Sequence, residues 1–263
     1  GGSIASALGA LAPGLLTTSL QSHAWPTVDS YRAVVVAYAC LGIVLCLLFS
    51  RSSVAVEATR AARAVAPSLV ARFAGLHRSQ SVVLRLSALF ALDSFGGGFV
   101  VQSFAAYWFY LRFGVDAKTL GTLFFAANVL AGLSALAASW LAGRIGLVNT
   151  MVATHLPSNV LLMVIPLMPT FELAALVLLL RFSISQMDVP TRQSYTMAVV
   201  VPEERAAASG ITGVARTAGA ALSPVFAGLL FSHASLISVP FFIAGTLKIV
   251  YDLLLFRAFR TLK

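Results

Sequence analysis

A few ionisable side chains interrupt the long apolar stretches of this sequence, and they are the first candidates for chemistry. Asp93 lies inside one such stretch and is followed by Gly96, Gly97 and Gly98. A charged side chain at bilayer depth costs at least about 2.5–3.5 kcal/mol, so its retention calls for a reason. Three consecutive glycines favour a kink, and a carboxylate beside a broken helix is a candidate site for a substrate or a proton. The alternative is a structural carboxylate that accepts a hydrogen bond from a neighbouring helix.

Two arginines in other apolar stretches are candidates for binding an anion. Arg181, Ser185 and Asp188 are spaced at i, i+4 and i+7, which places them on one face of a predicted helix. Alternatively, Arg181 forms an internal ion pair with Asp188 or Asp93 that holds a helical bundle together. Arg216 lies among small residues that permit close helix approach, and it either faces an anion or snorkels to the lipid headgroups.

Two amide side chains add polar groups at similar depth. Asn128 lies midway along its apolar stretch, where an amide can bind a polar substrate or join two helices by a hydrogen bond. Gln102 lies on the opposite side of an ideal helix from Asp93, so the two share a face only if the glycines distort that helix.

Other polar residues in the apolar stretches are interpreted as structural. His155 and Asn159, spaced i, i+4, do not make a metal site by themselves. Lys248 and Asp252 have the same spacing, which allows a structural pair along the last helix. The sequence contains no Gly-rich loop ending in Gly-Lys-Ser/Thr, no catalytic Ser elbow and no HExxH. We therefore expect no enzyme activity, no metal and no cofactor.

A further set of charges surrounds Pro190 and Pro202, where one apolar stretch ends and the next begins. One hypothesis is a cytoplasmic gate, in which salt bridges hold the protein in one conformation. The alternative is a solvated turn whose carboxylates cap the following helix. The predicted gate cluster, with the arginine of an earlier loop added, is Arg144, Asp188, Arg192, Glu203, Glu204 and Arg205.

The composition indicates that lipid surrounds the elements that carry these residues. The chain has 263 residues, of which 59% are hydrophobic and 10% charged, and its mean hydropathy is +0.91. Soluble domains carry about 25% charged residues. The net charge of +9 does not indicate nucleic-acid binding, because the basic residues lie in short segments between apolar stretches. Cys40 and Cys46 share one apolar stretch and predict no disulfide framework.

The apolar stretches are long enough to cross a bilayer as helices and lack the alternation typical of β-barrel strands. We predict an all-α membrane protein, a polytopic bundle of about eight transmembrane helices. The predicted helices cover residues 1–20, 31–49, 82–113, 119–143, 148–168, 171–187, 206–231 and 236–256.

The loop charges predict the orientation of this bundle. A polar, basic segment over residues 51–81 separates the first two predicted helices from the other six. Placing it in the cytoplasm gives that side most of the basic loop residues, as the positive-inside rule requires. The residues then assigned to the cytoplasm are Arg51, Arg60, Arg63, Arg72, Arg78, Arg144, Arg192, Arg205, Arg257, Arg260 and Lys263.

An internal repeat connects the two parts of the chain. Residues 7–13 and 218–224 align at their prolines with a constant offset, and the same offset carries the predicted helix over 31–49 onto residues 242–260. Two helices that agree at one offset indicate a parallel duplication of six-helix halves. The chain then begins in mid-fold, with four helices of the first half preceding Gly1.

Several segments resemble the major facilitator superfamily over nearly the whole chain, from a fifth helix to a twelfth. Residues 186–195 and 201–205 are similar to its tenth helix and the following turn, and residues 213–224 to its eleventh helix. Residues 142–146 resemble its short Gly-Arg loop, although the acidic residue that usually precedes Arg144 is absent. By the symmetry between the halves, Arg181 resembles the arginine that proton-coupled members use.

This resemblance implies a domain organisation and a function. Residues 1–50 would be the last two helices of an N-terminal half, 51–81 a cytoplasmic linker, and 82–263 the C-terminal six-helix half. The implied function is secondary active transport of a small solute by alternating access, such as proton-coupled efflux of a drug or metabolite by an antiporter. The expected pathway for substrate and protons contains Asp93, Gln102, Asn128, Arg181 and Arg216.

The implied surroundings are a bacterial inner membrane, with the C-terminus in the cytoplasm. The expected partners are the small solute, the lipid bilayer, protons and the missing N-terminal helices, without which this chain is not expected to transport. The alternative is a membrane receptor or lipid-binding scaffold that does not transport; movement of solute across a sealed bilayer distinguishes the two.

Overall fold

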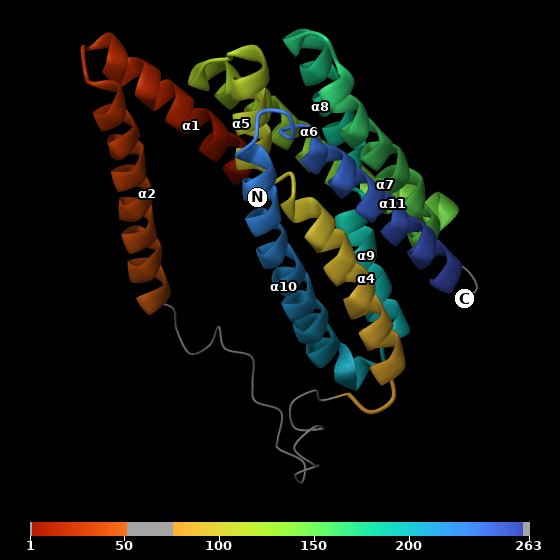
Figure 1. Cartoon of the computed structure of the whole chain (residues 1–263). Helices are drawn as coiled ribbons and strands as arrows, with labels where there is room; N and C mark the ends of the chain where they lie inside the picture. The colour runs from red at the N-terminus through yellow and green to blue at the C-terminus, as the bar shows by residue number, and fades with distance from the viewer. Residues whose placement is uncertain (1, 52–75, 260–263) are drawn as a thin grey trace.

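The computed structural model describes residues 2–51 and 76–259, and this part of the chain is built from helices joined by short turns, with no strand (Figure 1). Most of the predicted linker over 51–81 lies outside the described residues, as do the basic residues Arg60, Arg63, Arg72, Arg260 and Lys263. The α-helices are α1 (Gly2–Ser22), α2 (Thr27–Ser50), α4 (Gln80–Gly98), α5 (Gln102–Phe113), α6 (Ala117–Ile145), α7 (Leu147–Val164), α8 (Phe171–Ser185), α9 (Asp188–Val199), α10 (Arg205–Phe231) and α11 (Val239–Phe259). Two short 3-10 helices, η2 (Ile165–Leu167) and η3 (Pro202–Glu204), extend α7 and precede α10.

Seven segments in the described ranges are long and apolar enough to cross a membrane, which confirms an all-α membrane protein. They coincide with seven of the eight predicted helices, and each of the broken pairs α4–α5 and α8–α9 counts as one span. The first predicted helix also forms, as α1, but it is not among the seven. The seven spans are Thr27–Ser50, Gln80–Phe113, Ala117–Ile145, Leu147–Leu167, Phe171–Val199, Pro202–Phe231 and Val239–Phe259.

The helices from α4 onward form one bundle, and α1 meets it at one edge (Figure 1). Within the bundle, α4 packs against both α10 and α11, α11 also packs against α7, and α8 lies between α6 and α7. Helix α1 packs along α6, whereas α2 stands apart and Ser30 is its one buried residue. The apolar side chains of α2 therefore face lipid or other protein rather than this bundle.

Small residues let α4 and α10 approach closely. A Cβ at Gly219 of α10 would overlap the backbone of Ala91 on α4, and a Cβ at Gly98 would collide with Ser223 and lie 2.9 Å from the carbonyl oxygen of Ala220. Glycine at these two positions therefore brings the two backbones together, as is common where membrane helices cross.

The chain breaks its helix where the sequence places three glycines, which confirms the predicted distortion. Helix α4 ends at Gly98, and α5 begins only at Gln102. The glycines also make room for α11, because a Cβ at Gly96 would lie 3.2 Å from Leu247 Cβ and a Cβ at Gly97 would lie 3.4 Å from Lys248 Cε. Flexible backbone and close packing thus occur at the same point.

A second break was not predicted, and it separates residues assigned to one helical face. Helix α8 ends at Ser185 and α9 begins at Asp188, so the predicted continuous face of Arg181, Ser185 and Asp188 is wrong. The physical reason is Pro190, which has no N–H to donate and whose ring clashes with the carbonyl group of Gln186, four residues earlier.

Candidate functional site

The carboxylate of Asp93 is the centre of a buried group of charges. It is 5% exposed and accepts hydrogen bonds from Arg192 Nη1 to Oδ2, at 2.8 Å, and from Lys248 Nζ to Oδ1, at 2.6 Å. Oδ1 also lies 3.7 Å from His155 Nε2. One side chain of α4 thereby joins α7, α9 and α11.

Two more carboxylates complete this group. Asp252 of α11 is fully buried; its Oδ1 lies 2.8 Å from His155 Nδ1, and its Oδ2 accepts a hydrogen bond of 3.0 Å from Asn159. Asp188 lies 3.3 Å from Arg192 Nη2, one turn away on α9. We call the set the buried ion cluster; its members are Asp93, His155, Asn159, Asp188, Arg192, Lys248 and Asp252.

The buried ion cluster lies between two apolar regions of the bundle. Asp93 is placed between Phe90 of α4 and Phe99, which directly follows α4. Along α11, Lys248 is placed between Ala244 and Tyr251. Phe99 and Ala244 belong to one hydrophobic cluster, and Phe90 and Tyr251 to another. The charges are therefore enclosed by hydrophobic packing on both sides.

The formal charges of the buried ion cluster depend on His155. Asp93, Asp188 and Asp252 carry three negative charges, and Arg192 and Lys248 carry two positive ones. Both ring nitrogens of His155 face carboxylates, Nδ1 that of Asp252 and Nε2 that of Asp93. A doubly protonated His155 would make the set neutral, whereas a neutral imidazole leaves one net negative charge.

Two of these contacts bear on the interpretations made from the sequence. Lys248 does not pair with Asp252, because it reaches across to Asp93 on another helix. His155 and Asn159, which were interpreted as structural, both bind Asp252 inside the bundle.

Two members of the predicted gate cluster lie inside the protein rather than at its edge. Asp188 and Arg192 are each 4% exposed, because the buried face of α9 is formed by residues three or four positions apart. This face also contains Thr191 and Tyr195, and it points inward toward α4. Asp188 and Arg192, which were predicted to lie in a cytoplasmic turn, therefore belong to the separate helix α9 and face the interior.

The other members of that predicted cluster do not form a salt-bridge network with any described residue. Arg144 is exposed, and its guanidinium lies 4.0 Å from the ring centroid of Trp140. Glu203 is exposed, and Arg205 donates through Nε to the carbonyl oxygen of Met197 at 2.9 Å. Arg144, Glu203 and Arg205 are thus exposed, as in the solvated turn of the alternative, whereas Glu204 is buried.

Glu204 fastens the start of α4 to the start of α10. Its Oε1 accepts hydrogen bonds from the backbone N–H groups of His77, at 2.6 Å, and Arg78, at 2.8 Å, and its Oε2 accepts one of 2.9 Å from Ser79. These donors precede α4, where backbone N–H groups lack partners within the helix. Glu204 is therefore a tether between two helix ends.

Glu204→Gln is expected to lower the thermal unfolding temperature by several degrees. The amide NH₂ that replaces Oε2 or Oε1 would face backbone N–H groups, donor against donor. Glu203→Gln removes the same charge from an exposed neighbour and is expected to change stability by no more than about 0.5 kcal/mol. Thermal unfolding of both variants in detergent compares them, and equal melting temperatures would contradict the role of Glu204 as a tether.

Gln102 and Asn128 are brought together, but outside the buried ion cluster. Asn128 Nδ2 donates to Gln102 Oε1 at 3.1 Å and to the carbonyl oxygen of Phe124 at 2.7 Å. The pair joins the start of α5 to the middle of α6. Neither side chain contacts Asp93, so the five predicted pathway residues do not form one contiguous site.

Arg181 and Arg216 are both half-buried, and neither forms a salt bridge with a described residue. The predicted alternative for Arg181, an ion pair with Asp93 or Asp188, is not present, because Arg192 and Lys248 occupy those carboxylates. The Arg181 guanidinium instead lies 5.3 Å from the ring centroid of Phe182.

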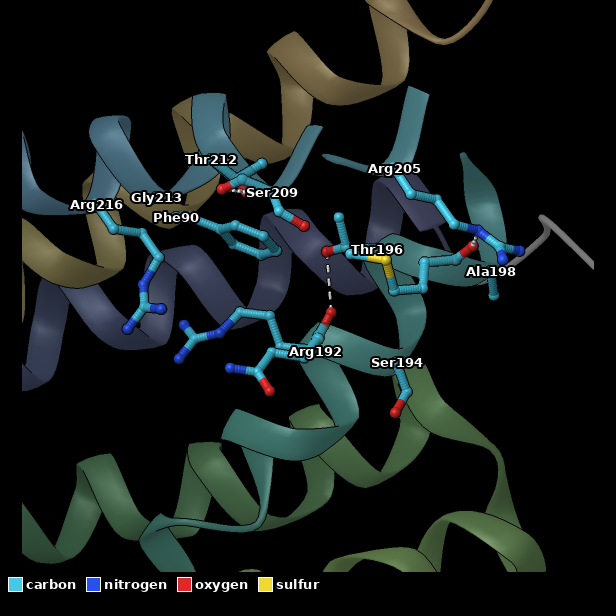
Figure 2. A pocket seen from close by; sticks show the side chains of 12 residues that line it. Phe90, Arg192, Ser194, Thr196, Ala198, Arg205, Ser209, Thr212, Gly213 and Arg216 are labelled. Atoms are coloured by element: carbon cyan, nitrogen blue, oxygen red, sulfur yellow. Dashed lines mark hydrogen bonds between the residues drawn. The ribbon is translucent and has the colours of Figure 1, made fainter. Parts of the chain in front are cut away.

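A cavity of about 760 Å³, lined by polar, basic and apolar residues, adjoins the buried ion cluster between α4, α9 and α10 (Figure 2). Phe90 of α4 forms one wall, and Arg192 links the cavity to Asp93. Figure 2 shows the Arg216 side chain directed toward the same end of the cavity as that of Arg192, whereas Arg205 lies at the other end.

The buried ion cluster also brings three ligand atoms of a type that metals use close together. Asp93, His155 and Asp188 each offer one atom, and these lie within 4.8 Å of one another. However, Arg192 and Lys248 already neutralise the two carboxylates at 2.6–3.3 Å. A divalent cation would add to two fixed positive charges, so the arrangement favours internal ion pairs over metal binding.

Comparison with known proteins supports the membrane location and no particular function. The chain is 28% identical over 176 residues to the uncharacterized membrane protein YJR124C of Saccharomyces cerevisiae. The match covers 66% of this chain and 39% of the yeast protein, so the chain spans well under half of that relative. No family model and no solved structure matches the chain. Together with the seven apolar spans, the relative supports an integral membrane protein.

Proposed function

We propose that this chain is the C-terminal part of a secondary active transporter of the major facilitator type, which moves a small solute by alternating access with proton coupling. The observation that carries the proposal is the buried ion cluster, which shares Arg192 with a cavity between the apolar helices α4, α9 and α10. The orientation predicted from loop charges and the parallel duplication predicted from the sequence repeat support the same family. The membrane in which the protein resides is expected to be a cytoplasmic membrane, and the yeast relative extends the candidates to eukaryotic membranes.

The energetic cost of the buried ion cluster supports a functional role. Removing charges from water costs several kcal/mol per ion, and apolar residues of similar volume are often equal or better for stability. Ionisable residues inside membrane proteins therefore commonly mark ion or proton pathways. Here three carboxylates and two fixed cations lie in one apolar bundle.

The helix breaks support a moving structure. Discontinuous helices commonly border the central binding sites of secondary transporters. In this chain one break follows Gly98 and another follows Ser185, and Asp93 and Asp188 lie close to them. Each break gives a helix a point at which it can bend without disrupting the hydrogen bonds on either side.

His155 supports the choice of protons as the coupling ion. An imidazole has two ring nitrogens that can each hold a proton, and both of those of His155 face carboxylates. Proton binding between Asp93 and Asp252 would change the net charge of the buried ion cluster, and Arg192 borders the cavity from the same cluster. Binding of a proton at His155 and binding of a solute beside Arg192 would thus affect the same set of ion pairs, which couples the two events.

His155→Gln is expected to abolish stimulation of transport by a pH gradient while solute exchange without a gradient persists. Glutamine keeps hydrogen-bonding capacity but cannot bind the proton. The complete protein that contains this chain is reconstituted in sealed vesicles with a pH-sensitive dye inside, and a panel of small metabolites and drugs is added outside. His233→Gln is the matched control, because His233 is exposed outside the buried ion cluster.

The same vesicles test the transport proposal itself. No solute-dependent proton flux and no solute exchange by the wild-type protein would refute transport and favour a receptor or scaffold. Wild-type gradient stimulation in His155→Gln would refute the proton role assigned to His155.

A further inference from the structure

The cavity beside the buried ion cluster carries basic charge and no acidic side chain. Three arginines line it, Arg192, Arg205 and Arg216, and its lining includes no Asp or Glu. Serine, threonine and glutamine supply the remaining polar groups, and the hydroxyls of Ser194 and Ser209 form no hydrogen bond with any residue that the structure describes. The field inside this space therefore attracts anions and repels cations.

Of the three arginines that line this cavity, Arg216 is the half-buried one that forms no salt bridge with a described residue. Arg192 already binds two carboxylates, those of Asp93 and Asp188. Arg216 is half-buried, forms no salt bridge with a described residue, and has a buried Nε without a hydrogen-bond partner. A guanidinium in a membrane bundle normally pairs with an anion, because leaving it unpaired away from water is costly.

We infer that this cavity binds a small organic anion, and that the Arg216 guanidinium donates hydrogen bonds to its carboxylate or phosphate group. The inference rests on the proposed transport function for its physiological meaning, because it names the class of solute that the site would carry. The guanidinium fork matches carboxylate and phosphate oxygens in pairs. The cavity volume of about 760 Å³ suits a metabolite-sized ligand.

The remaining walls indicate the rest of the ligand. Phe90 presents an aromatic ring to the cavity, and Gln193 and Ser209 supply neutral polar groups. These groups fit a ligand with one anionic end and a body that has both apolar and hydroxyl or carbonyl parts. A simple inorganic ion would leave most of the space to water.

A lipid headgroup shares the anionic chemistry of a free metabolite, so the experiment separates the two sources. The complete protein is placed in nanodiscs of zwitterionic lipid, and stabilisation against heat is measured with succinate, citrate and glycerol 3-phosphate. Succinamide and glycerol are the matched uncharged ligands. A parallel arm adds phosphatidylglycerol to the nanodiscs and omits the soluble anions.

At least one soluble anion is expected to stabilise the wild-type protein while its uncharged counterpart does not. Arg216→Gln is expected to weaken binding of that anion by about 10- to 100-fold, the usual effect of losing a hydrogen-bonded charge. Arg216→Lys keeps the charge and is expected to retain part of the affinity. Arg144→Gln removes an exposed arginine outside the cavity and is expected to leave binding unchanged.

Three results would overturn the inference: no soluble anion binds, stabilisation comes from phosphatidylglycerol alone, or Arg216→Gln binds anions as the wild type does. Folding of Arg216→Gln is checked by its melting temperature without ligand. Anion binding that depends on Arg216, without flux across sealed vesicles, would support this site and refute transport. Flux of cations or neutral solutes that is unchanged in Arg216→Gln would support transport and refute the anion site.

Discussion

Asp93→Asn is expected to destabilise the folded protein by about 3–5 kcal/mol, the usual cost of removing one partner from a buried ion pair. The change leaves the Lys248 ammonium, 9% exposed, without a carboxylate partner among the described residues, and it takes one of two carboxylates from Arg192. Thermal or denaturant unfolding of the complete protein in detergent measures the loss. We expect transport to be lost as well.

Two further variants make this expectation specific. Asp93→Asn combined with Lys248→Met removes both charges of one pair and is expected to recover much of the stability, because no unpaired ammonium remains. Asp29→Asn breaks the exposed pair with Arg32 and is expected to change stability by no more than about 1 kcal/mol. Wild-type stability of Asp93→Asn would show that the buried pairs do not hold these helices together.

Arg192→Gln is expected to have an effect of similar size, about 3–5 kcal/mol, and to abolish transport. The guanidinium spans two carboxylates, with Nη1 on Asp93 and Nη2 on Asp188, and Asp188 forms no other salt bridge in the described ranges. Arg192→Lys keeps the charge, but one ammonium cannot reproduce the planar fork between two acceptors. We therefore expect Arg192→Lys to fold more stably than Arg192→Gln while it still transports poorly.

Two control variants test the role of Arg192: one removes a positive and a negative charge together, and the other changes an exposed arginine. Arg192→Gln combined with Asp188→Asn removes a positive and a negative charge together, so it is expected to be more stable than Arg192→Gln alone. Arg257→Gln removes an exposed arginine near the end of α11 and is expected to have little effect. If Arg192→Gln and Arg257→Gln unfold alike, the contacts of Arg192 with Asp93 and Asp188 do not contribute to stability.

The helices could be predicted from the sequence because length and apolar content determine them locally. A run of about twenty apolar residues has few alternatives in lipid, since every backbone group must bond within its own segment. The break after Gly98 was also predictable, because three consecutive glycines act on the backbone where they stand. Pro190 also indicates the break before Asp188. It was placed where one apolar stretch ends, and it was not used to predict a break inside a membrane span.

The partners of the charged residues could not be predicted, because spacing arguments reach only along one helix. Asp93 binds Arg192 and Lys248, which lie 99 and 155 positions away in the sequence. Asp252 could pair with Lys248 one turn earlier, but tertiary packing gives it His155 and Asn159 instead. A side-chain pair at i, i+4 stabilises a helix by only about 0.2–0.5 kcal/mol. Leaving a buried charge without a partner costs far more, so tertiary contacts decide the pairing.

The double attachment of α4 to α10 limits how the cavity between α4, α9 and α10 can open. The two helices touch through Gly219 near their middles and are tied through Glu204 at their starts. We expect α4 and α10 to move together as a rigid pair. If one helix slid along the other or separated from it, both the contact at Gly219 and the hydrogen bonds of Glu204 would break. The remaining wall, α9, is joined to α8 by the two-residue link Gln186–Met187 and packs against α6 and α7. A rotation of α9 about that link would move Arg192 relative to Asp93.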